Sequence, residues 1–307
     1  MRRVQYEHSG GPEVLEVVSA DVPTPGPGEL LVRVEAIGVT LPGVRKVREQ
    51  REPIPLGGEI AGEVVAVGEG VDSYAPGYRV TGVVFGHGYA EYALLSVAMA
   101  SPIPDGASAV DAVALVRSGL VALGALDAAK PVEGESALVT AAASGVGHLA
   151  VQLARVRGAA RVVGAVSDPA KADFVRELGA DEVVAYDDAS WGSPVDYVLD
   201  AVGGELLTPA LAAVAPGGRL VAYSSGGGAV QAYDLLSGGK SVIGFQIARI
   251  AREQPEVYEH WRQELWQYFA SGLLRPVVHA EYALEDVATA HTVIEKRTNL
   301  GKVVLIP

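Results

Sequence analysis

The pattern that most constrains the fold begins near residue 137. From there, continuously apolar runs alternate with stretches that carry a helical stripe, as in Ala137–Ala142 followed by Val146–Arg157. Strands that are apolar along their whole length are buried on both faces, which requires a parallel sheet covered by helices. Because crossovers between parallel strands are right-handed, this region is predicted to form a doubly wound Rossmann sheet. The alternation continues through Arg161–Val166, Pro169–Leu178, Val183–Tyr186, Val195–Asp200, Leu206–Val214, Arg219–Tyr223 and Ser241–Phe245.

The residues on either side of this alternation have a different pattern. Up to about residue 115, short Val-rich runs are separated by proline and glycine, and the run that starts at Leu30 alternates apolar with polar residues. Turn residues interrupt these runs about every ten positions, which is typical of a small antiparallel β-barrel. At the other end we expect a long helix over Pro255–Ala270, then a strand at Pro276–Glu281, a helix at Leu284–Ile294 and a strand at Lys302–Ile306.

The composition excludes several classes of protein. A chain of 307 residues, 49% of them hydrophobic, is sufficient for about two folded domains and is too apolar to be disordered. A formal net charge of −13 disfavours binding to nucleic acids and to anionic membranes, and no apolar run approaches the roughly 18 residues of a membrane span. The absence of cysteine excludes thiolate nucleophiles and zinc sites that use sulfur. A soluble cytoplasmic protein is expected.

The most informative motif is the segment Thr140-Ala-Ala-Ala-Ser-Gly-Val-Gly-His148, which joins a buried strand to a helix. Gly145 and Gly147 lack a Cβ atom, so the backbone there can approach a diphosphate closely. The N–H groups at the start of the following helix would then point at the anion. The motif departs from G-x-G-x-x-G, because Ala141 and Ser144 occupy positions that are glycine in that pattern. At the first crossover of a βαβ series, the turn still predicts a dinucleotide site.

The end of the second predicted strand indicates which dinucleotide would bind. An NAD site usually has an acidic residue about 20 positions after the glycine turn, whereas here Ser167 takes that place and Lys171 follows. A small hydroxyl and a cation suit a 2′-phosphate, although Lys171 could equally be a solvated helix residue. Asp168 could bind a ribose hydroxyl, but with Pro169 behind it we favour a helix N-cap. The sequence therefore favours NADPH over NADH.

Several motifs, in their order along the chain, resemble the zinc-independent medium-chain dehydrogenase/reductase superfamily, in its quinone oxidoreductase branch. The resemblance covers nearly the whole chain. The motifs that carry it are Gly10-Gly-Pro-Glu-Val-Leu15, Pro27-Gly-Glu-Leu-Leu-Val-Arg-Val34, Gly57-Gly-Glu-Ile-Ala-Gly62 with Val67-Gly68, the turn Ala141–Gly147, and Gly301-Lys-Val-Val-Leu305.

The resemblance implies a fold, a coenzyme, a reaction and a set of site residues. The fold would be a GroES-like substrate domain (1–116 and 255–307) around a Rossmann domain (117–254), and a homodimer would form through the edge strand Ser241–Ile247. The reaction would be reduction by NADPH of a quinone or an α,β-unsaturated carbonyl. The diphosphate would be bound by Ala143, Ser144, Gly145, Val146 and Gly147. The 2′-phosphate would be surrounded by Ser167, Lys171, Tyr186 and Arg297, and the nicotinamide half would lie near Ser224, Phe245, Asn299 and Lys302.

The chain departs from the family pattern at the positions that would meet the substrate. Thr40 stands where the family usually has asparagine, and Gly43 stands where it has aspartate. Gly58 replaces the histidine of the G-H-E motif in zinc-dependent relatives, so no metal is expected. Hydride transfer needs no acid–base residue on the protein, because the coenzyme carries the chemistry. A developing oxyanion could be stabilised by Thr40 or by the hydroxyl of Tyr89, which could also donate a proton; the alternative for Tyr89 is a packing role.

Three functions fit these observations. The first is an NADPH-dependent reductase of quinones or activated C=C bonds. The second is a specialised biosynthetic enoyl reductase or cyclase on the same scaffold, suggested by the altered Thr40–Gly43 segment and by short loops at 45–53 and 81–88. The third is a non-catalytic NADPH-binding sensor, which the lack of an evident acid–base residue permits.

Overall fold

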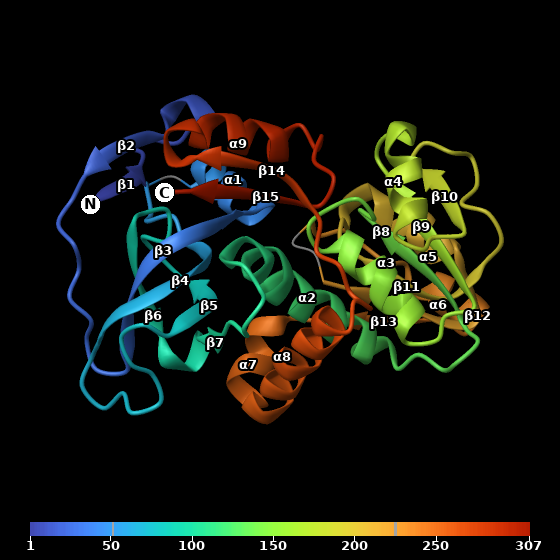
Figure 1. Cartoon of the computed structure of the whole chain (residues 1–307). Helices are drawn as coiled ribbons and strands as arrows, with labels where there is room; N and C mark the ends of the chain where they lie inside the picture. Colours follow the sequence, from blue (N-terminus) through green and yellow to red (C-terminus); the bar gives the residue numbers. More distant parts are fainter. Residues whose placement is uncertain (51, 224–225) are drawn as a thin grey trace. The chain divides into compact units, whose positions relative to one another are not determined.

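A computed structural model describes residues 1–50, 52–223 and 226–307. The chain divides into two compact units: Met1–Arg117 with Pro276–Pro307 form the first, and Ser118–Arg275 form the second. Figure 1 shows the C-terminal strand β15 (Lys302–Ile306) within the first unit, where it pairs with β3 (Glu29–Val39). The predicted domains differ from these units chiefly at the second boundary, which lies at 275/276 rather than 254/255.

The second boundary lies later because helix α8 (Pro255–Ala270) packs on α2 (Ala109–Ala129). A Cβ atom placed on Gly119 would lie 2.9 Å from the side chain of Leu265, and one placed on Gly124 would lie 2.8 Å from Trp261. These two glycines let the helices approach closely, which keeps the residues up to Arg275 in the second unit. A close contact between helices distant in sequence leaves no local pattern from which the boundary could be predicted.

The second unit contains a six-stranded parallel sheet in the order β10-β9-β8-β11-β12-β13. This strand order confirms the predicted doubly wound Rossmann sheet. The strands are β8 (Ser136–Thr140), β9 (Arg161–Val166), β10 (Glu182–Ala185), β11 (Val195–Asp200), β12 (Val214–Ala222) and β13 (Ser241–Gly244). The remaining helices of the unit are α3 (Gly147–Val156), η3 (Pro169–Lys171), α4 (Ala172–Glu177), η4 (Gly204–Leu206), α5 (Leu207–Ala212), α6 (Ala232–Gly238) and α7 (Ile247–Glu253).

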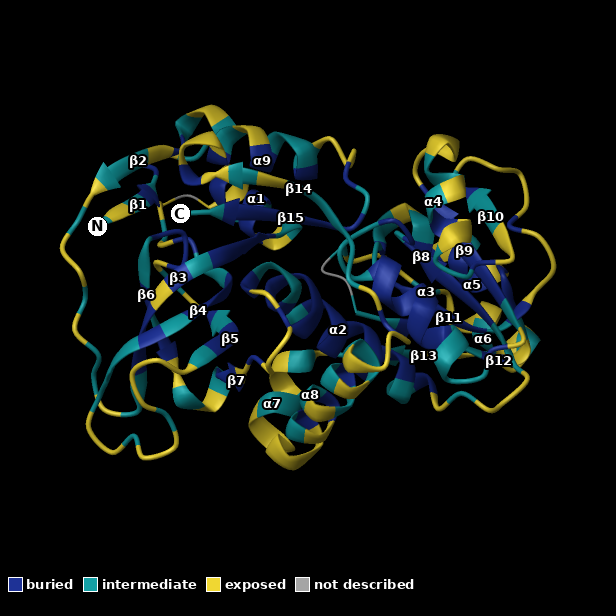
Figure 2. Cartoon of the chain, in the orientation of Figure 1, coloured by how far each residue is buried: buried dark blue, intermediate teal, exposed yellow. Residues whose placement is uncertain are grey.

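The central strands of this sheet form the core of the unit. Leu138, Val163, Val198 and Leu220 come from β8, β9, β11 and β12, and each has no exposed surface. Figure 2 shows the same strands as mostly buried, whereas α4 and the loops around it are largely exposed. The continuous apolar runs of the sequence are therefore the inner strands of the sheet, buried on both faces.

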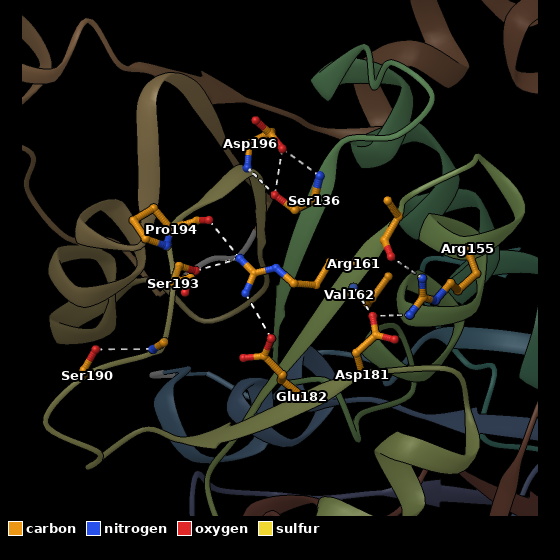
Figure 3. Close-up of polar contacts among 12 residues, drawn as sticks. Ser136, Arg155, Arg161, Val162, Asp181, Glu182, Ser190, Ser193, Pro194 and Asp196 are labelled. Carbon is orange, nitrogen blue, oxygen red and sulfur yellow. Dashed lines mark hydrogen bonds and ion pairs between the residues drawn. The ribbon is translucent and has the colours of Figure 1, made fainter.

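Polar side chains line the amino ends of the same strands (Figure 3). Asp196, just inside β11, accepts hydrogen bonds from both the N–H and the hydroxyl of Ser136, each at 2.7 Å. Arg161, at the start of β9, donates to Glu182 at the start of β10 (3.1 Å) and to the carbonyl oxygens of residues 193 and 194. These contacts tie the first residues of neighbouring strands together and so fix their register.

The first unit contains a seven-stranded sheet in the order β14-β15-β3-β4-β5-β7, with β6 also paired to β3. All of its pairs are antiparallel except β14–β15, which are joined by the crossover helix α9 that a parallel pair requires. The strands not yet introduced are β1 (Arg2–Gln5), β2 (Glu16–Ser19), β4 (Gly58–Val67), β5 (Arg79–Val84), β6 (Tyr92–Ser96), β7 (Ser101–Pro102) and β14 (Val278–Ala283). The helices are η1 (Pro12–Val14), α1 (Leu41–Glu49), η2 (Val97–Met99), η5 (Leu284–Asp286) and α9 (Val287–Glu295).

Helix α2 is the one helix of the described chain that is long and apolar enough to cross a membrane. Of its most apolar 18-residue window, 83% is buried inside the structure. A helix that is apolar on all sides and mostly buried is typical of the core of a large protein.

Candidate functional site

The glycine turn predicted from the sequence joins β8 to α3, and its first residue has an unusual backbone. Ala141 has φ = +49°, in the left-handed region that costs a residue with a Cβ atom about 1–2 kcal/mol. Its N–H donates to the hydroxyl oxygen of Tyr186 (2.9 Å), and its carbonyl oxygen accepts from the N–H of Ser144 (2.8 Å). Surrounding contacts therefore hold Ala141 in a conformation that glycine would adopt more readily.

Gly147, where α3 begins, allows the turn to close on itself. A Cβ atom at this position would lie 2.0 Å from the carbonyl oxygen of Ala141, so no other residue fits without movement of the backbone. The hydroxyl of Ser144 accepts the Gly147 N–H at 3.0 Å. Within the described chain, the N–H groups of Ala143, Gly145 and Val146 donate to no protein acceptor. These donors at the start of a helix suit an anion.

The carboxyl ends of β8 and β11 meet where the strand order reverses, which is where ligands bind in doubly wound sheets. Asp200, completely buried, accepts hydrogen bonds from the Thr140 hydroxyl (2.8 Å) and from the N–H groups of Val202 and Gly203 (3.1 and 2.9 Å). This carboxylate shapes the loop after β11. Thr140 and Asp200 were not among the predicted site residues, although each is the polar last residue of an apolar strand.

The residues after β9 begin with a capped turn of helix. Asp168 is the N-cap of η3, and its carboxylate accepts the Ala170 N–H at 2.9 Å. Capping, which was favoured over ribose binding, is thereby confirmed. Ser167 is exposed and Lys171 is partly buried at the end of η3. The cap engages the Oδ1 atom of the Asp168 carboxylate, next to the exposed Ser167.

Two loops beyond β11 and β12 lie against each other through glycine. A Cβ atom on Gly226 would lie 1.9 Å from the carbonyl oxygen of Val202, and the N–H of Gly204 donates to the carbonyl of Gly227 (2.8 Å). Ser224, predicted near the nicotinamide half, lies outside the described residues. Phe245 follows β13; its ring is 6.3 Å from that of Trp261, and a Cβ atom on Gly124 would meet it at 2.4 Å.

In the first unit, the hydroxyls of Thr40 and Tyr89, both predicted to be catalytic, lie close to Gly43. A Cβ atom on Gly43 would lie 3.5 Å from the hydroxyl of Tyr89 and 3.6 Å from that of Thr40. Thr40 is the N-cap of α1, and its hydroxyl accepts the Gly43 N–H at 3.4 Å. Tyr89 is 1% exposed and belongs to the core of the unit, as the packing alternative predicted.

A buried histidine accompanies Tyr89. The Nε2 atom of His291 lies 3.3 Å from the tyrosine hydroxyl, and burial lowers the pKa of His291 to about 4. Burial, with a smaller effect of the Glu59 charge, raises the pKa of Tyr89. Both side chains are therefore neutral at pH 7. No local sequence pattern predicts this pair, because the two residues are 202 positions apart.

The predicted nicotinamide residue Lys302 belongs to a buried charge cluster in the first unit. Its ammonium group pairs with one carboxylate oxygen of Glu59, and Arg117 donates to the other at 3.1 Å. Burial lowers the pKa of Lys302, and the neighbouring Glu59 opposes that shift. Asn299 is also buried and donates to the carbonyl of Gly301 (2.8 Å), and Arg297 follows α9 with φ = +56°.

The described residues contain no group of three or more His, Asp or Glu side chains arranged to hold a metal ion. His87 and Glu91 lie in the segment between β5 and β6, outside any helix.

Comparison with known proteins identifies relatives over the whole chain. Residues 26–105 match the alcohol dehydrogenase GroES-like domain, and residues 145–266 match the zinc-binding dehydrogenase domain. A quinone oxidoreductase of Pseudomonas aeruginosa is 32% identical, covering 100% of this chain and 99% of the relative. The solved structure of a mycobacterial protein complexed with NADPH is 30% identical, with a TM-score of 0.93 and full coverage of both chains. A segment of the spectinabilin polyketide synthase protein NorB of Streptomyces orinoci is 34% identical over 97% of this chain, which is 14% of that protein.

Proposed function

The chain belongs to the quinone oxidoreductase branch of the medium-chain dehydrogenase/reductase superfamily, and on that basis we propose that it transfers a hydride from NADPH to a quinone or to the C=C bond of an α,β-unsaturated carbonyl. The observation that carries the proposal is the turn Ala141–Gly147, with N–H groups that donate to no acceptor in the described chain and a glycine that admits no Cβ atom. Such a backbone can accommodate a diphosphate, and N–H donors at the start of a helix favour an anionic ligand.

Four observations support NADPH as the coenzyme. The Asp168 carboxylate is engaged in a helix cap, Ser167 is exposed, and Lys171 follows on the same short helix. A relative with 30% identity was solved in complex with NADPH. Ser167 and Lys171 would hold the 2′-phosphate, residues 143–147 the diphosphate, and Phe245, Asn299 and Lys302 the nicotinamide half.

The residues of the first unit suggest how the acceptor would be activated. NADPH, when bound, supplies the hydride, and the oxygen of the acceptor gains negative charge as the hydride arrives. The hydroxyl of Thr40 already accepts the Gly43 N–H, so its own proton is available to donate to that oxygen. Tyr89 is buried in the core of this unit, so Thr40 is the hydroxyl that we propose as the donor. Orientation and exclusion of water would supply the rest of the rate enhancement.

Steady-state assays test this proposal. We expect NADPH oxidation with at least one member of a panel of 1,2-quinones, 1,4-quinones, alkenals and enones, and a lower kcat/KM with NADH. A protein that binds NADPH but oxidises it with no acceptor would refute the reductase proposal and would support the sensor role instead.

The segment of NorB favours a second candidate function, reduction of an enoyl thioester in a biosynthetic pathway. The altered Thr40–Gly43 segment is compatible with an acceptor other than a simple quinone. Parallel assays with an enoyl N-acetylcysteamine thioester and the matching free enone would separate the two functions. A kcat/KM at least tenfold higher for the thioester would favour the biosynthetic role, and a cyclised product would identify a cyclase.

The proposal includes a cytoplasmic homodimer that forms through strand β13. This strand pairs with β12 on one side, and along the described chain no other strand pairs with it; Ser241 and Val242 are exposed. An exposed edge of this kind is a template for pairing with a second copy. Light scattering after gel filtration should give twice the chain mass, and a Val242→Lys variant should give monomers.

A further inference from the structure

Tyr186 lies beyond the end of β10, yet its hydroxyl reaches the turn that follows β8. Strand β9 lies between these two strands in the sheet, so the side chain crosses the end of β9. The Tyr186 N–H donates to the carbonyl of Val166 in β9 (2.9 Å), and its hydroxyl oxygen accepts the N–H of Ala141 (2.9 Å). One residue therefore links the loop after β10 to the first residue of the glycine turn.

The ring of Tyr186 is fixed by a second aromatic residue. Trp191, 5% exposed, has its ring centre 6.1 Å from that of Tyr186, with the planes inclined at 34°. A tyrosine packed beside another aromatic ring and held at its backbone N–H has little freedom to move its hydroxyl. The hydrogen bond to Ala141 is therefore preorganised.

Ala141 is the residue in the turn that most needs such support. Its φ of +49° is unfavourable for alanine, and the dinucleotide pattern has glycine at this position. Its carbonyl oxygen also contacts Gly147 closely, so a rotation of the Ala141 backbone would move the start of α3. The direction of the N–H groups that follow Ala141 depends on this conformation.

We propose that Tyr186 is a positioning residue for the diphosphate turn, and that its hydroxyl holds Ala141 in the left-handed conformation that aims the N–H groups of residues 143, 145 and 146 at the ligand. The inference rests on the proposed function, since it assumes that the turn binds a dinucleotide. It differs from the role that the family resemblance implies for Tyr186, which is contact with the 2′-phosphate. The diphosphate is common to NADPH and NADH, whereas the 2′-phosphate belongs to NADPH alone, so the two roles predict different selectivity.

The test is the Tyr186→Phe variant, with dissociation constants measured by fluorescence titration for both coenzymes. We expect NADPH and NADH to bind roughly five- to twentyfold more weakly, with the ratio of their affinities unchanged within about twofold. Tyr197→Phe is the matched control, because it removes a buried phenolic hydroxyl of the same unit that has no hydrogen-bond partner among the described residues. Coenzyme binding to this control should equal that of the wild type.

Rescue by glycine separates positioning from direct contact. In an Ala141→Gly background the left-handed conformation needs no support, so adding Tyr186→Phe should weaken coenzyme binding by less than about twofold. A loss confined to NADPH, unchanged binding of both coenzymes, or a full loss in the glycine background would each overturn the inference. If the wild type binds neither coenzyme, the proposed function fails first. Equal thermal unfolding of Tyr186→Phe and wild type without coenzyme would exclude a general loss of folding.

Discussion

The two ends of the Rossmann sheet are built in different ways. At the amino end, polar side chains satisfy one another: Ser136 bonds to Asp196, Arg161 bonds to Glu182, and Arg155 bonds to Asp181 (Figure 3). At the carboxyl end of β8, the turn is made of small residues, and several of its N–H groups have no protein acceptor within the described chain. Paired groups stabilise a fold, whereas unpaired donors are available to a ligand. The comparison therefore predicts that changes at the two ends will affect different properties.

The largest effect is expected from Gly147→Ala at the carboxyl end. Its methyl group would lie 2.0 Å from the Ala141 carbonyl oxygen, so the turn must move. We expect the dissociation constant for NADPH to rise about a hundredfold or more and the free energy of unfolding to fall by about 2–3 kcal/mol. Titration and denaturant unfolding measure the two quantities. Gly26→Ala, whose methyl group would meet only the flexible Glu29 carboxylate at 3.3 Å, should change neither.

A stability effect without a binding effect is expected from Arg219→Met at the amino end. Arg219 donates to Glu135 (2.5 and 2.7 Å) and to the carbonyl of Ala129 (2.7 Å), and it covers the ring of Tyr197. Removing it should lower the free energy of unfolding by about 2–3 kcal/mol, with NADPH affinity unchanged within about twofold. Arg252→Met, which removes a surface ion pair, should cost less than about 0.5 kcal/mol. A large loss of coenzyme binding in Arg219→Met would contradict the division between the two ends.

Acid should weaken the amino end through Asp196. Hydrogen bonds from the Ser136 side chain and N–H hold the pKa of this carboxyl below its ordinary value. A depressed native pKa contributes stability above the unfolded value of about 3.9 and loses it as the pH falls further. Asp196→Asn should therefore be about 1 kcal/mol less stable at pH 7, and the difference should shrink towards pH 3. Denaturant unfolding at a series of pH values measures this difference in the free energy of unfolding. A difference that does not change with pH would show that the charge of Asp196 does not contribute to stability.

The smallest effects are expected from alanine-to-glycine substitutions at the two ends of the Rossmann sheet. Ala141→Gly relieves an unfavourable φ but adds unfolded-state entropy, so we expect a net gain of about 0.5 kcal/mol. Ala160→Gly, just before β9 and without a positive φ, should lose about 0.5–1 kcal/mol. Chemical denaturation of both variants supplies the comparison. Equal losses in the two would show that the turn at Ala141 stores no strain.

The sequence predicted the parts of the molecule that depend on local pattern. The apolar runs from Ala137 onward identified the parallel sheet because period and length distinguish buried strands, and the Asp168-Pro169 pair identified a helix cap. The comparisons confirm the family, to which short motifs in a fixed order pointed.

The contacts that the sequence could not predict join residues far apart along the chain. Glu59 and Lys302 are separated by 243 positions, and Thr140 and Asp200 by 60, so no periodicity connects them. The support of Ala141 by Tyr186 depends on the order β10-β9-β8, which brings the ends of these strands together only after folding. The assignment of α8 to the second unit depends likewise on Leu265 and Trp261 reaching two glycines of α2.

The polar contacts at the amino end also have a geometric consequence. Ser136 and Arg161 are aligned in the sheet, and β8 runs five residues from Ser136 to Thr140, a length of about 17 Å. Because the first residue of β8 is held by these contacts, the strand cannot shift along its neighbours, and the position of its last residue, Thr140, is fixed. The polar contacts at the amino end of the sheet thus determine where β8 ends at the opposite edge. They would thereby set the position of a bound coenzyme without contacting it.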